Sequence, residues 1–109
     1  MARDPDWGLA IAVGLGGIWV EILNDSAVRL LPIGKADARE MLRSLRGAAL
    51  LEGYRGTPPA DLDRLADAIV AVGNAALALG PRLAALEINP LWVKGDRIEA
   101  LDALLIWRD

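Results

Sequence analysis

The sequence predicts an α+β domain in which one antiparallel sheet carries two helices on a single face. Three observations predict this class. The expected strands come in two groups around a pair of helices, in the order βββ-αα-ββ, and do not alternate with helices. Short turns join the strands within each group, which favours antiparallel pairing. The second helix has a single apolar stripe, which requires a sheet to cover it.

Length and composition predict one domain over residues 1–109. Apolar residues, not counting glycine, make up 54% of the chain, and 11 glycines come in addition. The sum exceeds the roughly 45–50% that apolar residues and glycine make up in typical soluble domains. We therefore expect part of the apolar surface to be covered by more of a parent polypeptide, by a partner subunit or by a second copy in a homo-oligomer.

The residue types that the chain lacks exclude several functions. Without cysteine there are no disulfides, thiol catalysis or zinc–thiolate sites, which agrees with a cytoplasmic protein. Without histidine there is no imidazole base and no phosphohistidine on this chain. A net charge of −3 with mixed signs disfavours nucleic-acid binding. No apolar run approaches the ~20 residues that span a bilayer, so we expect no membrane segment.

The first group of strands is expected at residues 9–13, 18–23 and 27–31, with the polar residues 1–8 as an ordered lead-in or a frayed end. The segment Gly14-Leu15-Gly16-Gly17 turns the chain after the first strand, and Pro32 stops the third. Short turns between these three strands predict an antiparallel meander.

Two helices follow. The first, at residues 35–45, places Ala38, Met41, Leu42 and Leu45 on one face. The second is expected to begin with Thr57 as N-cap and Pro58 at its first position, and to end at Gly80-Pro81. Its apolar stripe consists of Leu62, Leu65, Ile69, Val72, Ala76 and Leu79.

The last two strands, residues 83–93 and 97–107, form a hairpin around a two-residue Gly95-Asp96 loop. In this register the residue numbers of every cross-strand pair add up to 191. Asn89 then faces Asp102, with Cβ atoms roughly 4.5–5.5 Å apart. Glu87 shares their face because side chains alternate along a strand.

Glu87, Asn89 and Asp102 therefore bring two carboxylates and an amide oxygen to one patch, a ligand set that suits Mg²⁺. The alternative is an ordinary solvated strand face. The apolar residues on both sides of each group favour a functional role, because an uncompensated carboxylate among them is costly. Pro90 complicates the register, because a proline inside a sheet implies an edge position or a bulge.

Three further candidates lie in the first half of the chain. Gly14, Gly16 and Gly17 invite a phosphate-loop interpretation, but they match no phosphate-loop pattern and precede a strand, which favours a tight turn. Glu21 and Arg29 interrupt apolar strands, and the alternative to a catalytic role is that they pair with each other.

The four tryptophans are expected in the core or at an interface: Trp7, Trp19, Trp92 and Trp107.

Four motifs occur in order: GLGGIWVE from Gly14, followed by Arg29 and Pro32; LLEGYRG from Leu50; EINPL from Glu87; and ALDA from Ala100. Together they resemble the ATP-grasp domain of ADP-forming (NDP-forming) acyl-CoA synthetases, relatives of the succinyl-CoA synthetase β subunit. The resemblance covers about residues 4–107.

The resemblance implies reversible formation of an acyl-CoA from a carboxylic acid, CoA and ATP through acyl phosphate and phosphohistidine intermediates. It implies that Asn89 and Asp102 hold the Mg²⁺ of the nucleotide, with Glu87 as a nearby or water-mediated ligand. It also implies that the glycine segment and Glu21 line the phosphate-transfer site.

The same resemblance covers only the C-terminal half of an ATP-grasp unit. The preceding subdomain with its nucleotide-binding lysine, the phosphate-accepting histidine, and the CoA-binding and ligase domains are all missing. We therefore expect part of an enzyme whose isolated chain is inactive. Two alternatives stay open: a regulatory module of the kind fused to protein acetyltransferases, and an interaction domain without a nucleotide role.

Overall fold

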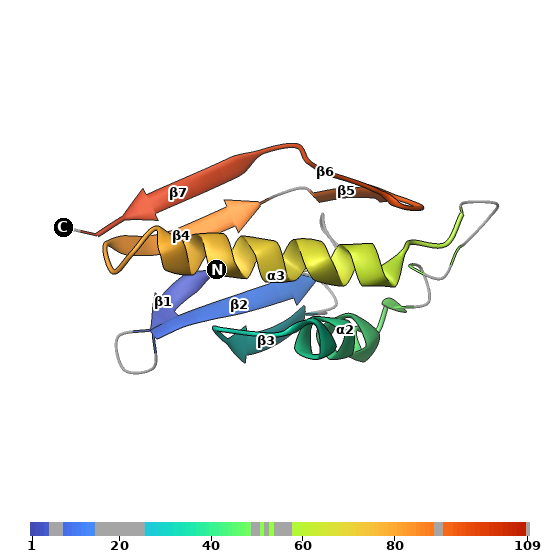
Figure 1. Ribbon diagram of the computed structural model, residues 1–109, viewed down its shortest axis with the longest axis horizontal. Helices are drawn as coiled ribbons and strands as arrows, with labels where there is room; N and C mark the ends of the chain where they lie inside the picture. Colours follow the sequence, from blue (N-terminus) through green and yellow to red (C-terminus); the bar gives the residue numbers. More distant parts are fainter. Residues whose placement is uncertain are drawn as a thin grey trace.

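The computed structural model describes residues 1–4, 8–14, 26–48, 51, 53, 58–88 and 91–108, without the side chains of Asp4, Leu91 and Trp92. Five strands form one antiparallel sheet in the order β3-β2-β1-β4-β7. These strands are β1 (Ala2–Asp4), β2 (Gly8–Gly14), β3 (Ser26–Leu30), β4 (Leu83–Ile88) and β7 (Ala103–Trp107). A second sheet pairs β5 (Leu91–Lys94) with β6 (Arg97–Ala100), and the helices are α2 (Lys35–Ser44) and α3 (Leu62–Ala78). The predicted fold class is confirmed (Figure 1).

The central strand of the large sheet is β1, which we had predicted to be part of a polar lead-in. Ala2 pairs with Ala10 of β2 on one side and with Ala85 of β4 on the other. Arg3 donates from Nε to the Leu83 carbonyl at 3.0 Å and from a terminal guanidinium nitrogen to the Gly80 carbonyl at 3.3 Å. The prediction was wrong because so short a segment carries no strand pattern of its own, and distant partners on both sides hold it in the sheet.

In the first group of strands, β2 pairs directly with β3, from Ala10 opposite Leu30 to Gly14 opposite Ser26. This pairing leaves no place between them for a further strand, so the expected meander order was wrong. The predicted strand at residues 18–23 lies outside the described residues.

The first helix agrees with its prediction, since α2 buries Ala38, Met41 and Leu42 and is followed by the buried Leu45. Asp37 accepts a hydrogen bond from the Gly34 backbone N–H at 2.9 Å, which satisfies one of the free donors at the start of the helix.

The start of the second helix was predicted too early. Asp61 is the N-cap of α3 and accepts from the Arg64 backbone N–H at 3.1 Å, whereas Pro58 lies outside the helix. The physical reason is Pro59, because a residue that precedes proline is disfavoured in the helical region. Thr57 lies outside the described residues. The predicted end is confirmed, with Gly80 at φ +90° after the last turn.

Both helices cover the same face of the sheet, here called the inner face. Their side chains form one core with Ile11 of β2 and Ala27 of β3. A second core joins Ala76 of α3 to Leu9, Leu83 and Leu86. In Figure 1 α3 crosses in front of the sheet, α2 lies beside β3, and β7 runs along the opposite edge.

The predicted hairpin is confirmed at its loop, where Lys94 pairs with Arg97 around Gly95 and Asp96. Its long strands are divided, however, into the β5–β6 pair and the β4–β7 pair. Residue numbers add up to 191 for every described pair from Ala85 onward, but Leu83 pairs with Trp107 instead of Arg108, because a bulge lies between Leu83 and Ala85. The bulge turns Leu83 to the inner face, where it is completely buried.

Among the described residues, no helix is both long enough and apolar enough to cross a membrane.

Candidate functional site

Glu87 and Asp102 lie on the face of the sheet that the helices leave bare, here called the outer face. Glu87 stands near the end of β4, opposite Leu104, and Asp102 immediately precedes β7. Both are exposed, and they line one shallow pocket of about 170 Å³ together with Ala103 and Leu104. The structure thus brings together the two carboxylates that the sequence analysis singled out.

Asp102 is held by its own backbone. Its Oδ1 accepts a hydrogen bond from the Ala103 N–H at 2.9 Å, which orients the carboxylate at the point where β7 begins. The other carboxylate oxygen has no described protein partner. A carboxylate offers about four lone-pair sites, so the hydrogen bonds from described residues leave most of the capacity of Asp102 for a ligand.

Asn89 and Pro90 lie outside the described residues, so the pairing of Asn89 with Asp102 remains a prediction. The pairs on either side of them are described: Ile88 faces Ala103, and Leu91 faces Ala100. Both pairs have the predicted register. The described irregularity of β4 lies instead between Leu83 and Ala85.

The charge of Glu87 acts on the chain's amino group. The Met1 amine donates to the Leu86 carbonyl at 2.6 Å. The pKa of this amine lies below its ordinary value of 8.0 because burial disfavours the charged form. The nearby Glu87 carboxylate offsets part of this lowering.

The outer face around these carboxylates is unusually apolar. An antiparallel sheet with one solvated face normally alternates apolar and polar residues. Here the register places small or aliphatic side chains across all five strands of that face: Val28, Leu30, Ala10, Ala12, Ala2, Ala85, Leu104 and Ile106. Val28, Leu30, Leu104 and Ile106 are each about half exposed. A bare surface of this kind marks a binding site or an interface.

Of the glycine segment, the structure describes Gly14 as the last residue of β2, and Gly16, Gly17 and Glu21 lie outside the described residues. Gly14 and Ile88 both line an apolar cavity of about 370 Å³ on the inner side of the sheet. The start of the glycine segment and the end of β4, next to Asn89, therefore meet at one cavity.

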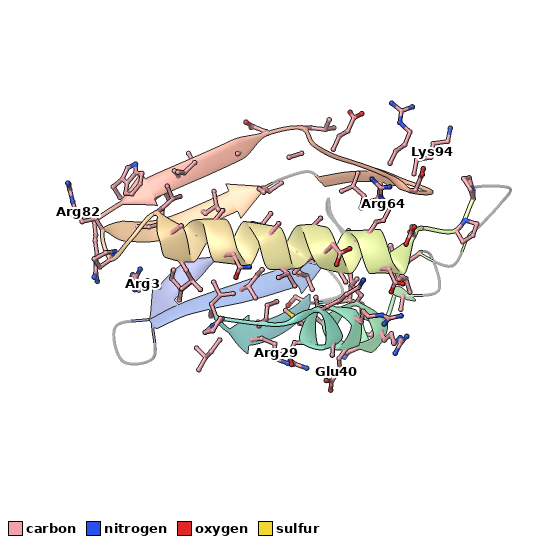
Figure 2. The ribbon with its side chains drawn as sticks, viewed as in Figure 1. Arg3, Arg29, Glu40, Arg64, Arg82 and Lys94 are labelled. Atoms are coloured by element: carbon pink, nitrogen blue, oxygen red, sulfur yellow. The ribbon has the colours of Figure 1, made fainter. Side chains whose placement is uncertain are left out.

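Arg29 has a partner that the sequence analysis missed. One guanidinium nitrogen donates to the Val28 carbonyl at 2.9 Å, and another lies 3.9 Å from the Glu40 carboxylate of α2 (Figure 2). The alternative pairing with Glu21 is not tested, because Glu21 lies outside the described residues. Only the tertiary approach of α2 to β3 reveals Glu40, since no sequence spacing links the two residues.

Comparisons with known proteins agree with this fold. A family model described as an ATP-grasp domain matches residues 1–106. The β subunit of ADP-forming acetate–CoA ligase I from Pyrococcus furiosus is 46% identical over 106 residues, which cover 97% of this chain and 45% of the subunit. The β subunit of ligase II from the same organism is 37% identical over 108 residues, covering 97% of this chain and 46% of that subunit.

A solved structure is also similar. The dinucleotide forming acetyl-coenzyme A synthetase 1 of Ca. Korarchaeum cryptofilum, in complex with coenzyme A and Mg-AMPPCP, superposes with a TM-score of 0.90 at 32% identity. The match covers 98% of this chain and 50% of the solved chain. The chain belongs to the ATP-grasp family, and it spans about half the length of the curated β subunits that it matches.

Proposed function

We propose that this chain is the C-terminal half of an ATP-grasp unit in an ADP-forming acid–CoA ligase, and that it carries the side of the site that holds Mg²⁺ and ATP. The observation that supports this most directly is the shared pocket of Glu87 and Asp102 at the end of β4 and the start of β7.

The donor set fits the proposed metal. Mg²⁺ usually binds one or two carboxylates and completes its shell with water and substrate phosphates. Asp102 and, from the resemblance, Asn89 would hold the ion, with Glu87 as a nearby or water-mediated ligand. The ion would neutralise charge on the transferring phosphate. The chain's own part is to hold these oxygens in place, and the Ala103 N–H bond to Asp102 contributes to this.

The apolar outer face supports the assignment to half of a cleft. It is continuous with the Glu87–Asp102 pocket through Leu104, which belongs to both. A ligand site needs apolar walls with a few polar groups that converge on one point, and this face provides one such wall. The remaining half of the unit would provide the other wall.

The relatives favour a ligase over the regulatory alternative, since both P. furiosus proteins are named as ADP-forming acetate–CoA ligase subunits. The substrates proposed here are ATP, CoA and a carboxylic acid. The glycine segment and Glu21 would line the phosphate-transfer side of the site, whereas Arg29 lies on the inner face beside Glu40 of α2.

A ligase assay on the natural polypeptide that contains this chain tests the proposal. We expect ADP formation that requires both CoA and a carboxylic acid, with acetate as the first acid to try. ADP formation that does not depend on CoA and the acid would count against the ligase assignment. So would the absence of ADP formation in a folded preparation that contains every subunit.

A further inference from the structure

The described residues leave one edge of the sheet bare on the side that the helices occupy. None of the five residues of β7 is buried, although four of them are large and apolar. Leu105 and Trp107 point to the inner face, because they pair with the buried Leu86 and Leu83, and they are 38% and 50% exposed. Large apolar side chains on the core side of a sheet are normally covered.

The gap follows from the spacing of helices and strands. Packed helices lie about 8–10 Å apart, and neighbouring strands lie about 4.8 Å apart. Two helices therefore cover roughly four strands, and this sheet has five. Figure 1 shows the result: α2 lies beside β3, α3 crosses in front of the middle of the sheet, and β7 runs along the far edge with no described helix over it.

The helix next to the gap is also apolar on that side. Val72 of α3 packs on the core that contains Leu83 and Leu86. Helical spacing places Ala75 and Leu79 on the same stripe as Val72, further along α3. Both are exposed, Leu79 by 42%. The bare strip thus has β7 as its floor and α3 as one wall.

We propose that an amphipathic helix, from the half of the ATP-grasp unit that this chain does not contain, packs over β7 beside α3. This inference rests on the proposed function, which makes the chain one half of that unit. The matched P. furiosus β subunits have more than half of their length outside the match, which is ample for such a helix.

A second copy of the chain would not cover this strip by the simplest route. Pairing two β7 edges would extend the sheet sideways, but Leu105 and Trp107 would stay bare on its inner face. A helix instead continues the existing helical layer and contacts both β7 and α3. Its contact stripe should carry apolar residues at i, i+3 or i+4 and i+7. An acidic residue is expected near the exposed Arg82 and Arg108 at the end of the strip.

Thiol reactivity tests the proposal, because the chain has no cysteine of its own. The natural polypeptide is prepared with Leu105→Cys and, as a matched control, with Asn74→Cys, which is exposed on α3 and lies off the stripe of Val72, Ala75 and Leu79. Alkylation rates are measured by peptide mass spectrometry in native buffer and in urea. We expect the native rate at position 105 to be lower than its unfolded rate by about tenfold or more, because a covered thiol reacts only during local opening. Position 74 should react at nearly its unfolded rate.

A benzophenone attached to the thiol of the Leu105→Cys variant identifies the occupant. Cross-links to a segment outside residues 1–109, at helical spacing, support the proposal. An unprotected thiol at position 105 overturns it, as do cross-links to a second copy of residues 1–109 or to a segment without helical spacing. The ADP assay on the same preparation separates the two hypotheses. An active ligase whose thiol at position 105 is unprotected refutes only the helix, and a protected but inactive protein refutes only the ligase assignment.

Discussion

At the scale of a single residue, Leu83 contacts segments from both ends of the chain, Arg3 of β1 and Trp107 of β7. It follows the turn after α3, it is completely buried, and its carbonyl accepts the hydrogen bond from Arg3 Nε. The bulge that separates it from Ala85 turns its side chain toward Ala76 and Leu9 instead of toward the outer face. Leu83 therefore joins the central strands to α3.

We expect Leu83→Ala to lower the free energy of unfolding by about 2–5 kcal/mol, because it removes buried methyl groups and leaves a cavity. Leu104→Ala is the matched control, since Leu104 is 52% exposed on β7, and it should cost about 1 kcal/mol or less. Urea denaturation of both variants provides the measurement. Equal losses would show that Leu83 is not anchored as described.

At the scale of the element, α3 illustrates how a helix start is chosen between two plausible caps. Thr57-Pro58 and Asp61 both fit the preferences for the beginning of a helix, and Pro59 decides between them. The cap is also tied to the hairpin, because the Asp61 backbone N–H donates to the Gly95 carbonyl at 2.8 Å.

Asp61→Ala should reduce the free energy of unfolding by about 0.5–2 kcal/mol through loss of the bond to the Arg64 N–H. Asp61→Asn keeps a side-chain oxygen and is expected to retain most of the stability. Thermal or urea unfolding of the pair decides the matter. If the alanine and asparagine variants were equally stable, the side chain would not be the cap.

The hairpin and the first helix could be predicted because their signals are local. Gly95-Asp96 sets the register of the strands beside it, and the spacing of Ala38, Met41 and Leu42 defines one helix face. The role of β1 could not be predicted in this way. Ala2 is a strand residue because Ala10 and Ala85 lie on either side of it, and the contact with Ala85 spans most of the chain.

The part of the candidate site that depends on local signals could also be predicted from the sequence. The hairpin register and side-chain alternation placed Glu87 and Asp102 on one face, and both line one pocket. The apolar outer face beside them was not predicted, because it combines residues of five strands whose order no local pattern reveals. The contact of Arg29 with Glu40 was missed for the same reason.

At the scale of the whole molecule, the high apolar content of the chain leaves apolar side chains exposed on two surfaces. These surfaces are the outer face of the sheet and the strand β7, where the exposed fractions lie between 38% and 52% for Leu104, Leu105, Ile106 and Trp107. Half of an ATP-grasp unit would present both surfaces to the other half.

The isolated 109-residue chain should therefore show little or no acid–CoA ligase activity. It has no histidine to carry a phosphoryl group and only one wall of the proposed nucleotide cleft. A coupled ADP assay with acetate, CoA and MgATP provides the check. Robust ADP release that requires CoA and acid, from the purified chain alone, would refute this expectation.

The most direct test of the central claim is the steady-state turnover of Asp102→Asn in the natural polypeptide, with Asp96→Asn of the hairpin loop as the matched control. Asparagine is nearly isosteric with aspartate, so thermal melts should be unchanged, while one negative charge facing the proposed cation is lost. Such charge stabilisation contributes several kcal/mol, so turnover should fall by roughly a hundredfold or more. Added Mg²⁺ should restore part of it, and Asp96→Asn should behave like the wild type. Near-wild-type turnover in a folded Asp102→Asn enzyme would contradict the claim that this chain holds the metal of the nucleotide.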